Sequence, residues 1–226
     1  MVLARVLDAN ANDQSILHRL RQAFSRPCLR SSNLRLVACT HASSPSSDLA
    51  LSHVAIGRGT QNYTCDLSND TAVPVAAGAV ASLFNVSCLA AANSPLLSIL
   101  PVIALNLPVP TSDDVDAAAN TDLSGHHYFL DATTPFFNMD TAEHSYGMGA
   151  FKKASSSAAP SDAMKGQYGQ GYGAVAWLKL AAKDTTGQVF QEVYRLNTAG
   201  GSPPSSCSGM PSKFEVEYAA QYWLYE

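Results

Sequence analysis

Acid/base side chains gather in one segment in the second half of the chain. His126 and His127 are adjacent and Asp131 follows them, while Arg58 stands earlier in the sequence. Imidazole and carboxylate groups transfer protons, and a guanidinium holds an anion, so these residue types predict a catalytic site of the hydrolase or isomerase kind. On a strand, His126 and His127 point to opposite faces, so only one of them can join a given site. His127 then shares a face with Asp131.

The same segment also contains ligand atoms for a metal ion, since Asp140, Glu143 and His144 follow within a few residues. The chain has neither a His-x-His nor an HExxH spacing, however, so we predict no metal site and no other cofactor. The nucleophile pattern GxSxG does not occur either, and no serine stands out as a nucleophile. Carboxylates for a glycosidase are available, but nothing in the sequence pairs them across a cleft.

Two isolated arginines are the strongest candidates for binding an anion. Arg58 and Arg195 are the only arginines after residue 41. Each offers a planar fork of N–H donors that suits a carboxylate or a phosphate, although an internal salt bridge or a backbone clamp is the favoured interpretation of an arginine in such a motif. Other polar and aromatic side chains complete a predicted ligand-binding site for a small molecule or a glycan. They are Gln61, Tyr63, Trp177 and Asn197.

A glycine pair superficially begins a dinucleotide-binding fingerprint. Gly57 and Gly59 follow a predicted strand, but Asn62 stands where the third glycine is needed, and the β-α-β rhythm is absent throughout. We therefore do not predict an NAD-dependent dehydrogenase. Residues 57–59 are interpreted as a turn or bulge between two strands, and residues 197–201 as a polar loop after a later strand.

Five cysteines without any CxxC pair indicate disulfides rather than a zinc or thioredoxin-type site. Proximity in sequence favours a bridge between Cys65 and Cys88, with Cys39 and Cys207 forming the second and Cys28 left over. Four cysteines can pair in three ways, so this assignment is a hypothesis.

N-glycosylation sequons at Asn62, Asn69 and Asn85 accompany these cysteines. Together with disulfides they favour the secretory route and an extracellular location. No signal peptide is visible, because the apolar run at residues 1–7 is too short and polar residues follow it. One explanation is an altered gene start that replaced the signal peptide.

Composition and charge limit the classes of partner that the sequence predicts. The chain has 14 basic and 18 acidic residues, of which residues 1–41 hold six arginines and two aspartates, so the remainder carries eight basic and sixteen acidic side chains. An acidic body argues against nucleic acid as a partner. The apolar segment 94–110 contains four prolines, so it is too broken for a membrane span and is predicted as a loop with at most a short helical turn. The sequence does not indicate an oligomeric state.

The elements that must position these residues are mainly strands. A mostly-β chain with almost no helix predicts a single-domain antiparallel β-sandwich or barrel over residues 49–226, with long loops rich in Pro, Ala and Ser. Residues 1–48 are predicted as an arm and a Ser/Pro linker, with an amphipathic helix at 13–26. The last strand, which contains Tyr218 and Tyr222, is predicted to be buried on one face. Strands are expected at residues 49–56, 61–67, 126–131, 173–182, 189–197 and 214–225, with a pair of strands within 72–92.

Five segments spread along the chain form a set. They are GRGTQNYTC (57–65), GHHYFLDATTPFF (125–137), AWLKL (176–180), YRLNTAGGSPPSSC (194–207) and EYAAQYWLY (217–225). In this order they resemble a secreted fungal family of unknown function, whose members often carry an automatic malate dehydrogenase label. The resemblance covers residues 49–226 and implies an extracellular β-rich domain with bacterial relatives, but no activity to carry over. The leading hypothesis is a secreted domain that binds a small molecule, glycan or surface partner, with an enzyme as the alternative.

Overall fold

The computed structural model of the chain describes residues 44–69, 71–110, 122–184 and 186–226. The predicted arm helix at 13–26, Cys28 and Cys39 lie outside the described residues. Strands hold far more of the described chain than helices do, and an extended segment with an apolar face must bury that face against another layer.

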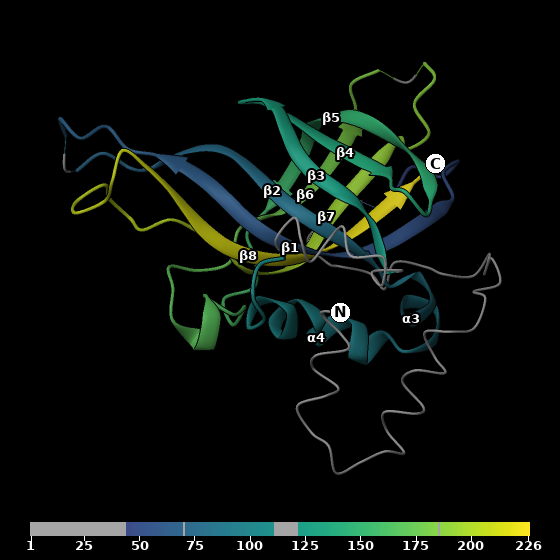
Figure 1. Cartoon of the computed structure of the whole chain (residues 1–226), viewed down its shortest axis with the longest axis horizontal. Helices are drawn as coiled ribbons and strands as arrows, with labels where there is room; N and C mark the ends of the chain where they lie inside the picture. The colour runs from purple at the N-terminus through teal and green to yellow at the C-terminus, as the bar shows by residue number, and fades with distance from the viewer. Residues whose placement is uncertain (1–43, 70, 111–121, 185) are drawn as a thin grey trace, which may run out of the picture.

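Eight antiparallel strands close into a barrel, in which each strand pairs with its neighbours in sequence and the last pairs with the first (Figure 1). The strands are β1 (Leu51–Thr64), β2 (Val75–Asn85), β3 (Leu123–Asp131), β4 (Thr134–Asp140), β5 (Ser145–Ser157), β6 (Trp177–Ala182), β7 (Glu192–Gly200) and β8 (Lys213–Tyr225). Closure removes the unpaired N–H and C=O groups of a sheet edge. The prediction of a mostly-β antiparallel fold is confirmed, and of its two architectures the chain adopts the barrel.

Strand β1 runs through the segment that the sequence predicts as a turn. Arg58 and its flanking glycines pair with β2 on one side and with β8 on the other. A Cβ on Gly59 would collide with the backbone of Val80, so the two strands approach too closely for a side chain at this position. The turn prediction for residues 57–59 is therefore wrong, because these glycines serve close packing within a strand and not a change of direction.

The helices α3 (Ser87–Ala92) and α4 (Ser94–Leu105) lie outside the barrel against β1, β7 and β8 (Figure 1). Residues 72–92 thus hold one strand followed by a helix, instead of the predicted strand pair. The loop predicted for 94–110 is also wrong. Its first proline lies in the first turn of α4, where no N–H is needed. Pro101 leaves the Leu97 carbonyl without its helical donor, and the buried Gln221 side chain donates to that carbonyl at 2.8 Å instead.

The sheet is buried on both faces where the helices cover it. Inside the barrel, Phe137, Phe151 and Leu224 belong to one apolar cluster. Between the barrel and the helices, Leu97 and Trp223 belong to a second, outer cluster. Because β8 contributes to both clusters, every residue from Tyr218 to Tyr225 is buried, and the prediction of one buried face for this strand is wrong.

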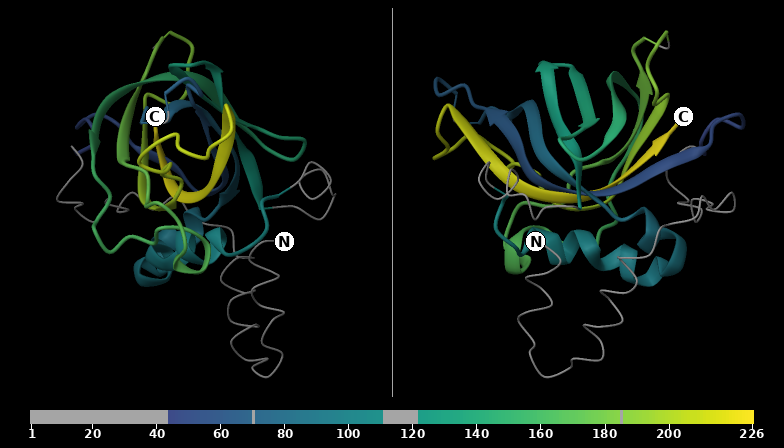
Figure 2. Two further views of the ribbon diagram at one scale, coloured as in Figure 1. Left: turned by 90° about the vertical axis from the view of Figure 1, so that its left-hand side faces the viewer. Right: turned by 45° about the vertical axis from the view of Figure 1, so that its right-hand side comes forward.

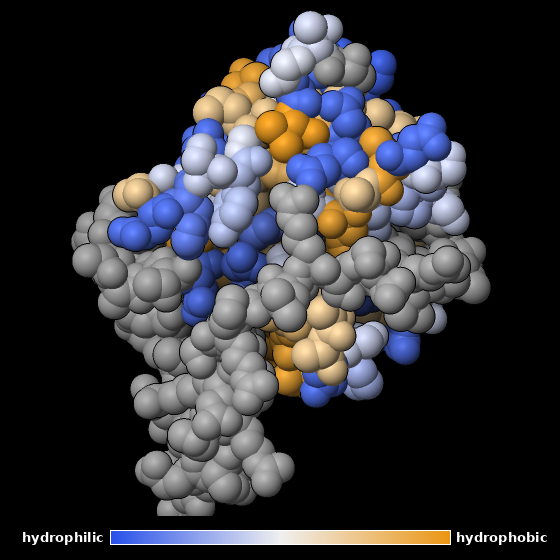
Figure 3. Space-filling model, turned by 90° about the vertical axis from the view of Figure 1, so that its right-hand side faces the viewer, coloured by the Kyte–Doolittle hydropathy of each residue, from blue (hydrophilic) through white to orange (hydrophobic). Residues whose placement is uncertain are grey.

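The two ends of the barrel differ. At the end where β1, β3, β5 and β7 finish, the β1–β2 and β7–β8 connections project well beyond the β3–β4 turn (Figures 1 and 2). A disulfide between Cys65 and Cys207 joins these two connections, with Cα atoms 5.6 Å apart. We call this the disulfide end. The C-terminus lies at the opposite end, where hydrophilic and apolar side chains are interspersed on the surface (Figure 3).

The observed bridge replaces both predicted pairings. Cys65 follows β1 and Cys207 precedes β8, and these strands are hydrogen-bonded neighbours, so the two cysteines meet despite a separation of 142 residues. Cys88 lies on α3. The Val86 N–H, just before this helix, donates to the Val54 carbonyl near the start of β1, whereas Cys65 follows the end of β1. The pairings predicted from proximity in sequence are therefore wrong, because the first and last strands are neighbours in the closed barrel. No helix among the described residues is long and apolar enough to cross a membrane.

Candidate functional site

Arg195 lies inside the barrel. Its neighbours on β7, Tyr194 and Leu196, pack into the outer cluster, so the alternation of a strand turns the Arg195 side chain inward. The residue is only 8% exposed. Its Nε and Nη2 donate to the Ala176 carbonyl at 3.3 and 2.9 Å, and this contact occupies the Nε side of the guanidinium.

Side chains from three other strands surround Arg195. Tyr222 is its direct partner on β8. Tyr63 on β1, His127 on β3 and Tyr218 on β8 all lie close enough to the guanidinium to interact with it electrostatically. The hydroxyl groups of Tyr218 and Tyr222 are hydrogen-bonded at 2.8 Å. The guanidinium therefore lies in a polar cluster in the barrel interior.

Burial keeps the phenols of this cluster uncharged. Loss of hydration raises the pKa of Tyr63 to about 12 and the pKa of Tyr218 well above its ordinary value, while the positive charge of Arg195 acts in the opposite direction on both. Burial likewise raises the pKa of Tyr222 against the effect of Arg195. At neutral pH these residues give the guanidinium hydroxyl dipoles but no counter-charge.

Arg195 has no carboxylate partner in the part of the chain that the structure describes. The ion pairs found there join Arg58 to Glu217 and Lys179 to Glu192. A buried guanidinium without a counter-ion destabilises a fold, because the interior does not replace the hydration that the charge loses. The position of Arg195 therefore has no explanation in the stability of the barrel alone.

Gln61 adds a second donor to the cluster. Its Nε2 is buried and has no hydrogen-bond partner, although the carboxamide lies near enough to the Tyr218 hydroxyl to oppose the rise in its pKa. The Tyr63 hydroxyl donates to the Gly201 carbonyl at 2.8 Å. The cluster thus combines a guanidinium and a carboxamide N–H₂ with uncharged hydroxyl groups and has no carboxylate within the described ranges, a set that suits an anion.

Two hydrogen-bonded backbone segments, residues 173–176 and 198–202, border the cluster at the disulfide end, and we call them the rim. The Val175 N–H donates to the Gly200 carbonyl at 3.0 Å, and the Thr198 hydroxyl donates to the Val175 carbonyl at 2.6 Å. The acceptor of Arg195, Ala176, belongs to the rim. The Cys65–Cys207 bridge fastens the connection that follows the rim.

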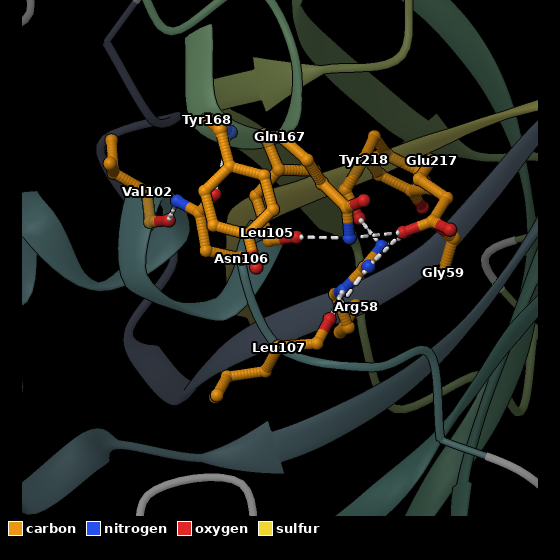
Figure 4. Close-up of polar contacts among 10 residues, drawn as sticks. All are labelled: Arg58, Gly59, Val102, Leu105, Asn106, Leu107, Gln167, Tyr168, Glu217 and Tyr218. Atoms are coloured by element: carbon orange, nitrogen blue, oxygen red, sulfur yellow. Dashed lines mark hydrogen bonds and ion pairs between the residues drawn. The ribbon is translucent and has the colours of Figure 1, made fainter. Parts of the chain in front are cut away.

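Arg58, the other isolated arginine, lies on the outer side of β1 and fastens the end of α4 (Figure 4). Its Nε and Nη2 donate to the Leu107 carbonyl at 3.2 and 2.8 Å. Nη1 donates to the carbonyls of Gly59 and Tyr218, and Nη2 pairs with the carboxylate of Glu217. The alternative of an internal salt bridge and backbone clamp therefore describes Arg58.

A glutamine extends this clamp to the β5–β6 connection. Gln167 Nε2 donates to Glu217 Oε2 at 2.8 Å and to the Leu105 carbonyl at 3.0 Å (Figure 4). The Tyr168 N–H donates to Asn106 Oδ1 at 2.8 Å in the same region. Every donor here has an acceptor within the chain, which is the signature of a structural network.

His127 is a core residue. It is 3% exposed, its ring stacks on Phe137 at 4.3 Å, and its Nδ1 lies 2.9 Å from the Phe136 carbonyl. A carbonyl only accepts, so Nδ1 carries the proton. Burial lowers the pKa of His127 to about 4, so the imidazole is neutral at neutral pH. His126 lies on the opposite face of β3, as strand alternation predicts, and is half-buried.

Asp131 ends β3 on the surface. It accepts hydrogen bonds from the Thr133 N–H and hydroxyl at 2.8 and 2.9 Å and from the Thr134 hydroxyl at 2.7 Å. These bonds, that of Thr134 first, lower the pKa of Asp131 to about 2. No hydrogen bond or ion pair joins Asp131 to His127 within the described ranges. Within those ranges, no group of three or more His, Cys, Asp or Glu side chains is arranged to hold a metal ion.

Within the described ranges, no hydrogen bond or ion pair joins the last two predicted ligand-binding residues, Trp177 and Asn197, to the cluster. Trp177 packs into the outer cluster, where its Nε1 is buried without a hydrogen-bond partner. Asn197 adopts a φ of 47° at the irregularity of β7 between Leu196 and Ala199. The segment 197–201 is thus the bulged end of a strand and not a free loop. The cluster instead includes Tyr218 and Tyr222, which alternation along β8 could have identified as inward-facing.

The sequons occupy different settings. Asn69 is exposed in the β1–β2 connection, and its Oδ1 accepts from the Thr71 N–H and hydroxyl at 3.1 and 2.8 Å. Asn62 is half-buried on β1, and Asn85 is half-buried at the end of β2 with its Oδ1 bound to the Ser87 N–H. Asn69 therefore presents the most accessible acceptor.

Residues 45–226 match the model of a protein family whose description reads "Protein of unknown function (DUF3455)". The match covers all eight strands and every residue of the polar cluster around Arg195. No curated protein and no solved structure is similar enough to the chain to count as a match.

Proposed function

The chain belongs to this family of unknown function, which supplies no activity, and we propose from the geometry that the barrel binds a small anionic molecule at Arg195. The supporting observation is the buried guanidinium that has no carboxylate partner among the described residues. A bound anion provides the missing counter-charge and accepts hydrogen bonds from the remaining N–H groups of Arg195 and from Gln61 Nε2. Tyr218 and Tyr222 then complete the site with hydroxyl groups.

The barrel architecture is compatible with this role. An eight-stranded barrel is wide enough for its side chains to fill the interior or to hold one small ligand. The apolar middle of this barrel is filled, since Phe137 and Phe151 are fully buried there. The ligand is therefore expected at the disulfide end, next to the rim, and not along the whole axis.

The competing hypothesis of an enzyme has weaker support. It needs His126 or His127 to work with Asp131 and Arg58. His127 is neutral and packed among rings, Asp131 caps an exposed turn, and Arg58 lies on the outer side of the barrel wall. An acid/base pair acts only when both groups reach the same substrate atom or its neighbour, and these groups face different environments.

Isothermal titration calorimetry of the full chain tests the binding proposal. The titrants are sodium formate, acetate, benzoate and inorganic phosphate at constant ionic strength. We expect at least one of them to bind the wild type, and Arg195→Gln to abolish that binding. Lys152→Gln is the matched control, because it removes an exposed positive charge from the face of β5 opposite to the buried Phe151. Binding that Arg195→Gln leaves intact, or no binding by any titrant, overturns the proposal.

We also propose that the protein works in an oxidising extracellular setting as a glycoprotein modified at Asn69. The Cys65–Cys207 bridge and the exposed Asn69 sequon support this location. Intact mass of protein secreted by its native host, before and after reduction and deglycosylation, tests it. A glycan lost in Asn69→Gln but kept in Asn62→Gln and Asn85→Gln is expected. A reduced, unmodified protein in the cell extract contradicts it.

A further inference from the structure

We infer that the ligand at Arg195 is a planar aromatic monocarboxylate, an inference that rests on the proposed anion binding. The first argument is charge. Arg195 is the one buried cation on the inner face within the described ranges, since Lys153, which shares a face of β5 with Phe151, is exposed, and Lys179 is paired with a carboxylate on the outside. His127 donates its Nδ1 proton to a backbone carbonyl and packs between rings, so it adds no charge. One buried positive charge balances one negative charge.

The donor arrangement favours a carboxylate over a phosphate. The Nε side of Arg195 is taken by the Ala176 carbonyl, which leaves two N–H groups on Nη1 and one on Nη2, and the guanidinium also lies close enough to the Tyr222 hydroxyl to lower its pKa. One remaining N–H of Nη1 and the one of Nη2 lie side by side as a pair of donors. A carboxylate presents two oxygens in one plane that fit such a pair, and Gln61 Nε2 can donate to either oxygen. A phosphate dianion would leave one negative charge and several acceptors unmatched in a buried site.

The body of the ligand is expected to meet aromatic rings. From the cluster toward the disulfide end, the inner face carries Tyr63 and its cross-strand partner Phe214, whose rings stack with centroids 5.5 Å apart. On β3, Phe129 tilts against His127 at 5.5 Å and rests over the backbone of Gly78. Aromatic side chains prefer offset-stacked or edge-to-face contact with another ring.

Two of these rings are only half-buried. Phe129 and Phe214 are intermediate in exposure, although both belong to the inner face at the end where Arg195 is found. The wall between them includes Ala79 and Ala81, which carry only methyl groups. A sugar acid would place hydroxyl groups against rings and methyl groups that accept no hydrogen bonds. An aromatic ring would cover the same apolar atoms without leaving polar groups unpaired.

Competition among small anions tests the ligand class. The full chain is titrated by calorimetry with benzoate, acetate, glucuronate and inorganic phosphate at constant ionic strength. We expect benzoate to bind on the order of tenfold or more tightly than acetate, since the phenyl ring adds stacking and apolar burial. Phe129→Leu, which keeps an apolar side chain but removes the ring, should weaken benzoate several-fold and leave acetate unchanged. Lys152→Gln, on the outer face of β5, should change neither.

The outcomes separate the two proposals. If acetate, glucuronate or phosphate binds as tightly as benzoate or more tightly, and Arg195→Gln abolishes that binding, anion binding stands and the aromatic class is wrong. If Phe129→Leu weakens benzoate and acetate equally, the ring contact is wrong while the carboxylate contact stands. If no titrant shows binding that depends on Arg195, both proposals fail.

Discussion

Arg58 and Arg195 are both buried in the wall of one barrel, yet their surroundings are opposite. Arg58 is fully buried, and its guanidinium reaches three backbone carbonyls and the carboxylate of Glu217. Arg195 reaches one carbonyl, that of Ala176, and no carboxylate within the described ranges. The same side chain thus serves a structural network on the outer face and an incomplete polar cluster on the inner face.

The difference teaches which of the two arginines the fold needs. A satisfied guanidinium such as Arg58 fixes α4 and the β5–β6 connection, so its loss leaves several acceptors unpaired. An unsatisfied guanidinium such as Arg195 contributes little to stability until an anion arrives. The contrast therefore predicts opposite changes in stability when each arginine is replaced.

The largest loss of stability is expected when Arg58 is replaced. Arg58→Gln should lower the free energy of unfolding by about 3–5 kcal/mol, because buried carbonyls lose their donors and Glu217 loses its partner. Urea unfolding of purified variants measures this. Glu217→Gln is the comparison and should cost less than Arg58→Gln, because the Glu217 side chain is 42% exposed and an amide oxygen still accepts from the guanidinium, although Arg58 loses its counter-charge. If Arg58→Gln and Arg195→Gln both lowered the free energy of unfolding by the same small amount, the proposed difference between the two arginines would be wrong.

The folded protein should become less stable at acidic pH, because two buried histidines bind protons more readily in the unfolded chain. The pKa values of His127 and His53 are lowered to about 4 from 6.5, mainly by burial, so the unfolded chain binds more protons than the folded one between these values. Stability is fully present above about pH 6.5 and falls as the pH drops toward 4, by on the order of 2–3 kcal/mol per histidine. Asp131 loses its contribution only at lower pH, because its pKa is about 2.

Unfolding curves from pH 7.5 to 4 check this pH dependence. His127→Phe should flatten the acid side of the profile by about half, since His53 remains. Leu130→Ala, at an exposed position of β3 without a titratable group, is the control. Anion binding at Arg195 should stay constant from pH 8 to 6, because His127 adds no charge in that range. A steep rise in affinity over that range would show that Arg195 does not act alone.

Loss of the disulfide should affect both stability and the Arg195 site. The double variant Cys65→Ser, Cys207→Ser should lose about 2–4 kcal/mol of stability, because the bridge closes a long loop. It should also weaken anion binding, since the connection after the rim is released, whereas Arg58→Gln should alter stability alone. Cys88→Ser on α3 is the control. Chemical denaturation and calorimetry measure the two effects, and unchanged affinity would uncouple the disulfide from the site.

The smallest effect is expected at Arg195 itself. In a buffer poor in small anions, Arg195→Gln should change the free energy of unfolding by less than about 1 kcal/mol or stabilise the protein, because it removes an unpaired buried charge. Added benzoate should raise the stability of the wild type and not that of the variant. A large loss of stability in the variant without any anion would mean that Arg195 is a structural residue like Arg58.

Much of the fold follows from local patterns. Alternating apolar residues predict the positions of β3, β7 and β8, and with them the mostly-β class. Strands β4 and β5 lie outside every predicted strand, because Pro135 and the glycines of β5 are poor local signals. Gly147 and Gly149 are explained only by tertiary packing, against Val189 and Gln188. Helix α4 was missed for a similar reason, since the hydrogen bond that accommodates Pro101 comes from Gln221, far along the chain.

The candidate site was predictable residue by residue but not as a group. Arg195, Gln61, Tyr63 and His127 attract attention by type, and the barrel brings them together from three strands. Nothing in the sequence distinguishes Arg195 from Arg58, because the face of the wall on which each lies depends on barrel closure. The disulfide shows the same limit, since its two cysteines meet only through the pairing of β1 with β8.

A crystal structure of the full chain grown with benzoate, at a resolution that shows small ions, tests the central claim most directly. We predict density for a carboxylate within hydrogen-bond distance of the Arg195 guanidinium inside the barrel, with the ring directed toward Phe129. Arg195 paired with a carboxylate of its own chain, and benzoate absent from the interior, would contradict the account and make both arginines structural.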